Sequence, residues 1–286
     1  MKLTEKRAVI TGAGRGIGEA IALAFAAQGA RLVLVSRSTE ALEHVARKAR
    51  DIGAPVATLT ADVSRAETGS SVVDIARREY GGIDILVNNA GVYGPIGPFA
   101  ETDFDAWWRA MEVNLGGTAR ITHAVVPHMV AQRRGKIVNL SGGGATSPLP
   151  NLTAYSVSKT AVVRLTENLS EELKPHNIQV NAIAPGTVNT RLQDQLLAAG
   201  EQVAGDLFVR IKAMRETGKG SVPPALVAEL AVFLASADAD AITGKLISAP
   251  HDPWREWSGS EEGLASPMYT LRRVDAFTLS PLKDRL

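Results

Sequence analysis

The chain alternates short apolar runs with longer segments in which apolar residues recur every three or four positions. The short runs predict buried strands, and the longer segments predict helices with one apolar face. The predicted strands span residues 8–10, 31–36, 56–60, 83–87, 135–140, 178–183 and 244–248. The predicted helices span 17–28, 41–52, 67–80, 103–133, 154–173 and 225–235, and residues 185–222 are expected to be irregular.

This order of elements predicts an α/β fold. Strands that alternate with helices form parallel βαβ units with right-handed crossovers, so seven strands predict a doubly wound parallel sheet with helices on both faces. No internal repeat or low-complexity linker divides the sequence, which predicts a single domain over residues 1–248. Residues 249–286 form a C-terminal extension that is too apolar for a simple disordered end. We expect it to pack across a subunit interface or to cover a substrate pocket with Trp254, Trp257, Arg272 or Arg273.

Composition limits the partners and the compartment. The 286 residues are 45% hydrophobic, enough for a buried core, and 31 basic against 30 acidic residues give no indication of a nucleic-acid partner. Because cysteine is absent, disulfides and thiolate ligands are excluded, and the five histidines lack the spacing of a metal site. There is no apolar leader and no run of the ~18 apolar residues that cross a bilayer. We expect a soluble cytoplasmic protein with no metal and no membrane partner.

A glycine-rich turn joins the first predicted strand to the first predicted helix. Its sequence is Thr11-Gly-Ala-Gly-Arg-Gly-Ile-Gly18, which departs from G-x-G-x-x-G because Ile17 and Glu19 stand where a third glycine would be needed. Such a turn lets the backbone approach a phosphate, and the helix N-terminus adds free N–H groups. The turn predicts a pyrophosphate site, and a tight turn without a ligand is the alternative. The residues assigned to this site are Gly12, Gly14, Arg15, Gly16, Ile17 and Gly18.

In a sheet of this type the ligand lies beyond the carboxyl ends of the strands. Ser36 and Arg37 follow the second strand, where an NAD binder commonly carries an acidic residue. A guanidinium can bind a phosphate through two hydrogen bonds, so Arg37 and Arg15 favour NADP(H) over NAD(H), unless both are solvated surface residues. Asp62, followed by Val63, would accept the adenine amino group or cap the next helix. Residues 88–91 are expected to form part of the cofactor wall, with their amides joining neighbouring strands.

Tyr155 and Lys159 are four positions apart at the start of a predicted helix, so they share a face. A neighbouring ammonium favours the phenolate, which would let the tyrosine pass a proton at neutral pH. The spacing alone is also compatible with a surface pair. Its place after the fifth strand, beside the predicted cofactor, favours a catalytic role.

The set of these motifs resembles the short-chain dehydrogenase/reductases over residues 4–248. The motifs are Thr11-Gly-x-x-x-Gly-x-Gly18, Asn88-Asn-Ala-Gly91, Asn114, Ser141, Tyr155-x-x-x-Lys159 and Pro185-Gly186. The resemblance implies a Rossmann-like fold, a homotetramer or homodimer, and an NADP(H)-dependent enzyme that interconverts a ketone and a secondary alcohol. It implies that Tyr155 is the acid/base, that Lys159 lowers its pKa and holds the nicotinamide ribose, and that Asn114 holds a water in a proton relay. The residues it places along the cofactor also include Asn89, Ala90, Gly91, Pro185, Gly186, Val188 and Thr190.

One departure from the family pattern concerns the serine that would hydrogen-bond the substrate oxygen. It most often stands 13 residues before the tyrosine, where this chain has Gly142, whereas Ser141 stands 14 before. Either the following loop carries one extra residue and Ser141 points inward, or the role of the serine is altered. The rival function is a regulator that binds NADP(H) without turnover. A basic cluster at Arg210, Lys212, Arg215 and Lys219 is expected to be a solvated face, with an anionic substrate as the alternative.

Overall fold

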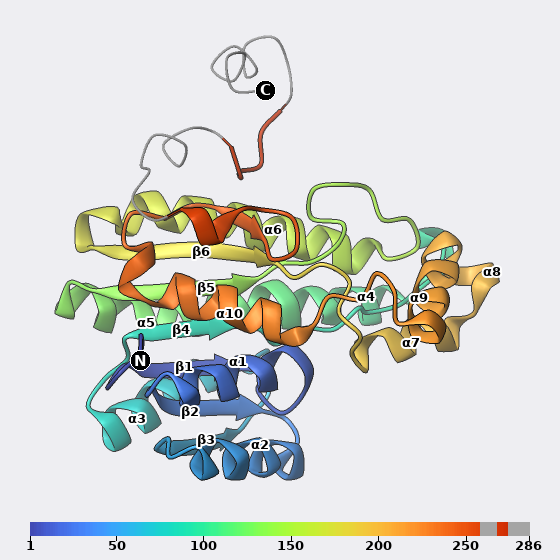
Figure 1. The fold of residues 1–286 in the computed structure, drawn as a ribbon. Helices are drawn as coiled ribbons and strands as arrows, with labels where there is room; N and C mark the ends of the chain where they lie inside the picture. The colour runs from blue at the N-terminus through green and yellow to red at the C-terminus, as the bar shows by residue number, and fades with distance from the viewer. Residues whose placement is uncertain (258–267, 274–286) are drawn as a thin grey trace.

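The computed structural model describes residues 1–257 and 268–273. In these residues, seven parallel strands form one sheet in the order β3-β2-β1-β4-β5-β6-β7, as Figure 1 shows. The strands are β1 (Arg7–Thr11), β2 (Arg31–Ser36), β3 (Val56–Thr60), β4 (Ile85–Asn88), β5 (Gly135–Leu140), β6 (Ile178–Ala184) and β7 (Leu246–Ser248). The order reverses between β1 and β4, and this confirms the predicted doubly wound α/β sheet.

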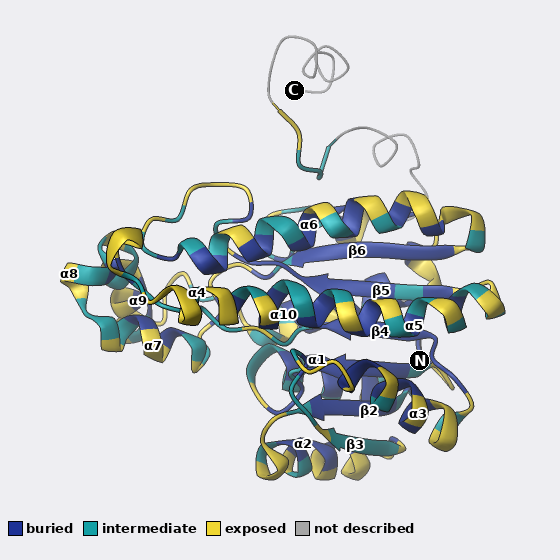
Figure 2. Ribbon diagram, turned by 180° about the vertical axis from the view of Figure 1, so that it is seen from behind, coloured by how far each residue is buried: buried dark blue, intermediate teal, exposed yellow. Residues whose placement is uncertain are grey.

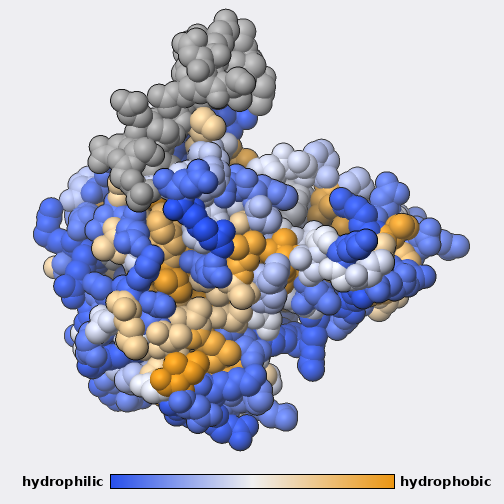
Figure 3. All heavy atoms as spheres, viewed as in Figure 1, coloured by the Kyte–Doolittle hydropathy of each residue, from blue (hydrophilic) through white to orange (hydrophobic). Residues whose placement is uncertain are grey.

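Helices cover both faces of the sheet. They are α1 (Gly16–Ala27), α2 (Thr39–Asp51), α3 (Thr68–Tyr80), α4 (Phe104–Met111), α5 (Thr118–Gln132), α6 (Thr153–Leu173), α7 (Leu192–Ala199), α8 (Glu201–Ala204), α9 (Asp206–Thr217) and α10 (Pro224–Ala235). The apolar sides of α1, α2 and α10 pack on one face, and those of α3, α5 and α6 pack on the other. Figure 2 shows the result, with buried strands between helices whose outer sides are exposed. On the first face, apolar side chains also reach the surface over α1 and α10 (Figure 3).

Two predicted elements differ from the structure. Residues 185–222 are not irregular, because α7, α8 and α9 lie within them. These helices are short and are separated by Gly200 and Gly205, which have positive φ, so no single helical period runs through the segment. The long helix predicted over 103–133 is present as α4 and α5, but a π-helical stretch, Glu112–Gly117, joins them.

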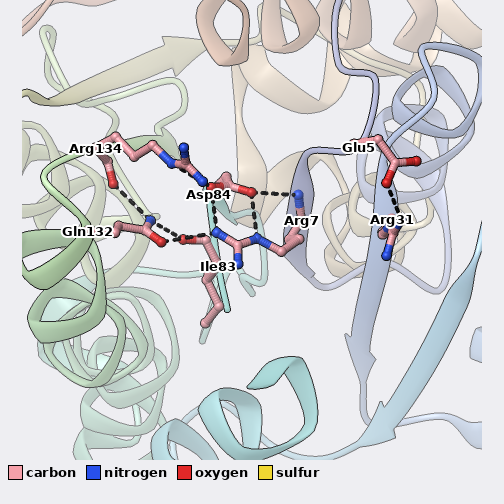
Figure 4. Close-up of polar contacts among 7 residues, drawn as sticks. All are labelled: Glu5, Arg7, Arg31, Ile83, Asp84, Gln132 and Arg134. Carbon is pink, nitrogen blue, oxygen red and sulfur yellow. Dashed lines mark hydrogen bonds and ion pairs between the residues drawn. The ribbon is translucent and has the colours of Figure 1, made fainter. Parts of the chain in front are cut away.

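An ion-pair cluster around the buried Asp84 joins three strands at the end opposite their carboxyl termini (Figure 4). The Arg7 side chain donates two hydrogen bonds to Asp84, at 2.6 and 2.7 Å, and its backbone N–H donates another at 3.1 Å. The Arg134 side chain donates a fourth at 3.2 Å. Burial would raise the pKa of Asp84, but the hydrogen bonds from Arg7 and the charges of Arg7 and Arg134 outweigh it and lower that pKa. The cluster therefore links the starts of β1, β4 and β5.

The described residues of the C-terminal extension pack on their own chain. Trp254 and Trp257 are buried in the same apolar cluster as α10. The backbone N–H of Leu246 in β7 donates to the Tyr269 carbonyl at 2.7 Å, and that of Leu271 donates to Glu167 of α6 at 2.6 Å. The extension thus covers the free edge of β7. In the structure Trp254 and Trp257 pack into the core, and Arg272 pairs with Glu167 at 3.3 Å. The role expected of Trp254, Trp257, Arg272 or Arg273, at a subunit interface or over a substrate pocket, remains a prediction.

Candidate functional site

The glycine turn after β1 fits closely against the end of β4. Gly12 and Gly16 have φ values of +65° and +59°, which favour glycine. A β-carbon at Gly18 would lie 2.2 Å from the Gly12 carbonyl oxygen, and one at Gly12 would lie 2.8 Å from the Ala90 α-carbon. Side chains are therefore excluded from a backbone turn that leads into the N-terminus of the 12-residue helix α1. This arrangement fits a dinucleotide pyrophosphate.

The amides of Asn88 and Asn89 join neighbouring strands, as predicted. The Asn89 side chain donates to the carbonyls of Thr11 at 3.0 Å and Gly12 at 3.1 Å. The Asn88 side chain donates to Asn139 of β5 at 2.9 Å and to Thr122 of α5 at 2.9 Å. Sequence reasoning missed Asn139 and Thr122, because nothing in the local pattern shows that they face a residue on β4.

The residues assigned to the adenosine end of the cofactor lie after β2 and β3. A β-carbon at Gly14 would lie 3.0 Å from the Ser36 hydroxyl, so Ser36 borders the glycine turn. Asp62 accepts hydrogen bonds from the backbone and side chain of Ser64, at 3.0 and 2.8 Å. Burial would raise the pKa of Asp62, but the Ser64 hydrogen bonds and the nearby charge of Arg37 lower it. Asp62 thus shapes its own turn, and its contact with adenine remains a prediction.

Two other predicted residues of the cofactor wall pack against the chain on either side of the site. A β-carbon at Gly117 would lie 2.6 Å from a Val63 methyl group, so Val63 packs at the end of the π-helical stretch. A β-carbon at Gly16 would lie 3.3 Å from the Thr190 methyl group, so Thr190 lies beside the glycine turn. Arg215 donates to the Thr190 carbonyl at 3.2 Å and pairs with Asp194 at 2.6 Å. One member of the basic cluster therefore anchors the loop after β6.

The loop after β6 is closely packed at Gly186 and Val188. Gly186 has a φ of +72°, and a β-carbon there would lie 2.8 Å from Val222 and 3.0 Å from Pro250. Val188 is buried. The loop is therefore held between the segment before α10 and the residues that follow β7, and its contact with nicotinamide remains a prediction.

Asn114 lies in the π-helical stretch and is fully buried. Its side-chain oxygen accepts a hydrogen bond from the Val92 N–H at 2.8 Å. Its side-chain nitrogen donates to the Val92 carbonyl at 2.9 Å and to the Ser158 hydroxyl at 2.9 Å. Asn114 thus holds the backbone of the loop after β4, and the predicted relay water remains a prediction.

Tyr155 and Lys159 occupy consecutive turns of α6 and are both buried. The Lys159 ammonium donates to the Leu140 carbonyl at 2.8 Å and lies 5.8 Å from the centre of the Tyr155 ring. Burial lowers the pKa of Lys159 to about 8. Burial, and then the phenol of Tyr93, raise the pKa of Tyr155, which is opposite to the lowering expected from the ammonium. At neutral pH the tyrosine is therefore a protonated phenol, able to donate a proton.

Position 142, rather than 141, faces the Tyr155 hydroxyl. A β-carbon at Gly142 would lie 2.0 Å from the hydroxyl oxygen. The Ser141 backbone N–H donates to the Ile183 carbonyl at 2.9 Å, which continues the pairing of β5 with β6. The Ser141 hydroxyl is buried and has no hydrogen-bond partner among the described residues. The assignment of Ser141 as the substrate-binding serine remains a prediction, and this geometry favours the altered role.

An apolar cluster that sequence reasoning missed surrounds Tyr155. The ring of Tyr93 meets the Tyr155 ring edge to face, with centres 4.9 Å apart. The buried members of the cluster are Leu152, Tyr155, Leu196, Ala204, Ile211 and Met214, and Tyr93 and Phe208 pack against them. The helical spacing of the leucines in residues 192–197 could have indicated an apolar helix face here. Gly200 and Gly205, which follow, interrupt that spacing. In the described residues there is no cluster of metal-binding side chains and no helix long and apolar enough to cross a membrane.

Comparisons with known proteins agree with this architecture. A family model described as short chain dehydrogenase matches residues 6–200. The chain is 36% identical over 248 residues to dehydrogenase/reductase SDR family member 4 of Sus scrofa, covering 86% of each protein. It is 36% identical to the 3-oxoacyl-acyl-carrier-protein reductase FabG of Thermotoga maritima, covering 86% of this chain and 97% of that protein.

Solved structures are similar over the same region. A xylitol dehydrogenase with bound NAD⁺ has a TM-score of 0.78 and 30% identity, covering 87% of this chain and 98% of that one. A variant of the actinorhodin polyketide ketoreductase with NADPH has a TM-score of 0.77 and 32% identity, covering 85% and 95%. The sheet, the glycine turn and the Tyr155–Lys159 pair thus occur in a chain whose relatives are dehydrogenases and reductases.

Proposed function

Because this chain belongs to the short-chain dehydrogenase/reductase family and is therefore an oxidoreductase, we propose that it interconverts a ketone and a secondary alcohol with NADP(H). The observation that carries the proposal is the buried, protonated Tyr155 beside Lys159, at the same end of the sheet as the glycine turn. A regulator that binds the nucleotide without turnover would not require this pair to be buried together.

The preference for NADP(H) is supported by the residues after β2. Ser36 borders the glycine turn, and the exposed Arg37 guanidinium lies near enough to Asp62 to lower its pKa. No acidic residue stands at 36 or 37 to hold the ribose hydroxyls of NAD. Similar proteins of known structure carry NAD⁺ in one case and NADPH in another, so they do not favour either cofactor. The argument for NADP(H) therefore rests on this chain's own residues.

The cofactor preference can be tested with Arg37→Ala, and Arg78→Ala is a matched control because Arg78 is exposed on α3 and pairs with Glu79. A charge-assisted hydrogen bond contributes about 1.5–3 kcal/mol, so Arg37→Ala should weaken NADPH binding roughly 10- to 100-fold and leave NADH binding unchanged. Equal losses for NADPH and NADH would contradict the preference.

In the proposed reduction, the bound dinucleotide supplies a hydride to the carbonyl carbon. Tyr155 donates its proton to the carbonyl oxygen, and the low-dielectric surroundings keep that phenol protonated until the oxygen becomes basic. Lys159 would hold the nicotinamide ribose and, when charged, would stabilise the phenolate that remains. Leu196 of α7 and Met214 of α9 lie in the same buried cluster as Tyr155, so the surroundings of the phenol are largely apolar. Oxidation of the alcohol reverses these steps.

The surroundings of Tyr155 favour an apolar ketone. Leu152, Leu196 and Met214 are buried beside the phenol. Arg215, the partly buried member of the basic cluster, is already paired with Asp194. These residues offer apolar surface to a substrate. Among the described residues of this apolar cluster and of the basic cluster, no unpaired buried cation is present to bind an anionic substrate.

The decisive assay follows the oxidation of NADPH with apolar ketones, sugar-nucleotide ketones and β-ketoacyl thioesters. We expect turnover with an apolar ketone and its loss in Tyr155→Phe, with NADPH binding retained. Tight NADPH binding without turnover across the panel would instead favour the regulator.

We also propose that the protein is a cytoplasmic homodimer or homotetramer. The absence of cysteine suits a reducing compartment. Phe104 and Trp108 on α4 are 61% and 52% exposed, and their stacked rings provide an apolar surface suited to contact between subunits. Light scattering on the purified protein would measure the assembly.

A further inference from the structure

Reduction of a ketone places growing negative charge on an oxygen that can accept more than one hydrogen bond. Removing one such donor from an enzyme commonly costs about 10²–10³-fold in rate, so a single donor is a costly arrangement. In the function proposed above, Tyr155 supplies one hydrogen bond. A second donor would have to lie beside its hydroxyl.

Position 142 cannot supply this second hydrogen bond, because it is a glycine. Ser141 has a hydroxyl, but that oxygen is sealed from solvent in the structure and has no partner among the described residues. Its backbone is also held in the β5–β6 pairing. The hydroxyl of Ser141 would reach a substrate only after the chain around it opened.

Tyr93 provides the alternative. Its ring meets Tyr155 edge to face, with ring centres 4.9 Å apart, and it packs on the apolar cluster of α7 and α9. Neither phenol hydroxyl makes a hydrogen bond with a described residue, and neither oxygen is sealed as the Ser141 hydroxyl is. Burial raises the pKa of Tyr93 to about 12, so this phenol also keeps its proton at neutral pH.

The backbone on both sides of Tyr93 is fixed. Asn114 holds both the N–H and the carbonyl of Val92, at 2.8 and 2.9 Å. Gly94 follows with a φ of +76°, and a β-carbon there would lie 2.7 Å from the Ala110 side chain. The loop therefore presents Tyr93 from a rigid turn, which is the condition for a preorganised donor.

We propose that the Tyr93 hydroxyl is the second hydrogen-bond donor to the substrate oxygen, in place of a serine side chain at position 142. During reduction, the hydride bonds to the carbonyl carbon and the electron pair of the C=O π bond moves to oxygen. The Tyr155 proton transfers to that oxygen, and water later returns a proton to Tyr155. Tyr93 keeps its own proton and stabilises the oxygen while the charge develops. This inference rests on the proposed ketone reductase function.

The test compares Tyr93→Phe with Ser141→Ala in the full chain, using the apolar ketone that the wild type reduces best. Tyr93→Phe keeps the ring and removes the hydroxyl alone. We expect it to lower kcat about 10²-fold, with KM and NADPH affinity within about twofold of the wild type, because the bond strengthens in the transition state. Ser141→Ala tests the rival donor, and Tyr93→Phe should lower kcat at least about tenfold more than Ser141→Ala does.

Tyr80→Phe is the matched control, since the Tyr80 hydroxyl donates to the Leu32 carbonyl at 3.3 Å, far from the site, and its loss should leave kcat unchanged. Wild-type kcat in Tyr93→Phe, or an equal loss in Ser141→Ala, would overturn the inference while leaving the proposed function in place. A parallel loss of NADPH affinity in Tyr93→Phe would also overturn it, because it would indicate a structural role. A wild type that reduces no ketone would instead overturn the proposed function, and the inference with it.

Discussion

The space at Gly142 makes a direct prediction for Gly142→Ala. A β-carbon at this position would lie 2.0 Å from the Tyr155 hydroxyl oxygen and 2.8 Å from the ring carbon that bears it. Real β-carbons essentially never approach another heavy atom closer than 3.0 Å. The hydroxyl must therefore move by roughly 1 Å, or the backbone of the loop must move instead.

Tyr155 has little room for that movement. Its side chain is 9% exposed, and its ring is bounded by Tyr93 and by the apolar cluster of α7 and α9. A displacement of about 1 Å in a reacting group can lower a rate by about 10²-fold, because the proton donor no longer meets the substrate oxygen. We expect Gly142→Ala to lower kcat/KM by about that factor.

The assay measures ketone reduction, NADPH affinity and thermal unfolding for Gly142→Ala and for Gly143→Ala. Gly143 is the matched control, because a β-carbon there would meet no atom within 4 Å. NADPH affinity should be the same in both variants, since the glycine turn lies on another loop. The reasoning would be refuted if Gly142→Ala reduced ketones as fast as Gly143→Ala, or if the two variants lost activity equally.

Two further predictions concern stability. Asp84→Ala should lower the unfolding free energy at neutral pH by roughly 3 kcal/mol, because it leaves the largely buried Arg7 without its charged partner. The pKa of Asp84 is lower in the folded protein than its unfolded value of about 4, so its contribution to the unfolding free energy is complete above that unfolded value. The contribution is lost as the pH falls through the lower folded pKa. The unfolding free energies of wild type and variant, measured by denaturant titration, should therefore converge in acid. Trp254→Ala should lower the unfolding free energy by about 3–5 kcal/mol, because Trp254 is 4% exposed and packs on Phe233. Trp108 is 52% exposed, so Trp108→Ala should change the melting temperature of the monomer little. Equal effects of the two tryptophan substitutions would show that the start of the extension is not part of the core.

The sequence predicted the parts of the fold that depend on local pattern. Buried parallel strands appear in the sequence as apolar runs, and the glycine turn is recognisable because the φ values at Gly12 and Gly16 strongly favour glycine. The segment 185–222 could not be predicted in this way. Its helices are stabilised by contact with Tyr155 and Leu152, which are distant in sequence, and the apolar face of each helix is too short to show a period of its own.

The hydrogen bonds between polar side chains on different elements also could not be predicted from the sequence. Asn88 is satisfied by Asn139 and Thr122, and Asn114 is satisfied by Val92 and Ser158. Each partner is set by the register of the sheet and by the π-helical stretch, neither of which follows from spacing along the chain.

The predicted effect of Lys159 on the pKa of Tyr155 differs from the structure because burial could not be judged from spacing. The four-residue spacing suggests that the ammonium lowers the pKa of the phenol, whereas burial raises it and also lowers the pKa of Lys159.

The offset of the serine can be understood from the end of β5. Ser141 still pairs with β6 through its N–H, so strand alternation continues to govern its side chain. It therefore shares a face with Asn139, whose amide bonds Thr166 beneath α6, and this accounts for a hydroxyl that is sealed rather than presented to the site. Position 142 is the first residue beyond the last β5–β6 hydrogen bond, and a β-carbon there would meet the tyrosine directly. An inserted residue in the loop that follows would lie after this point, so it could not rotate Ser141 toward Tyr155 without breaking the last β5–β6 hydrogen bond.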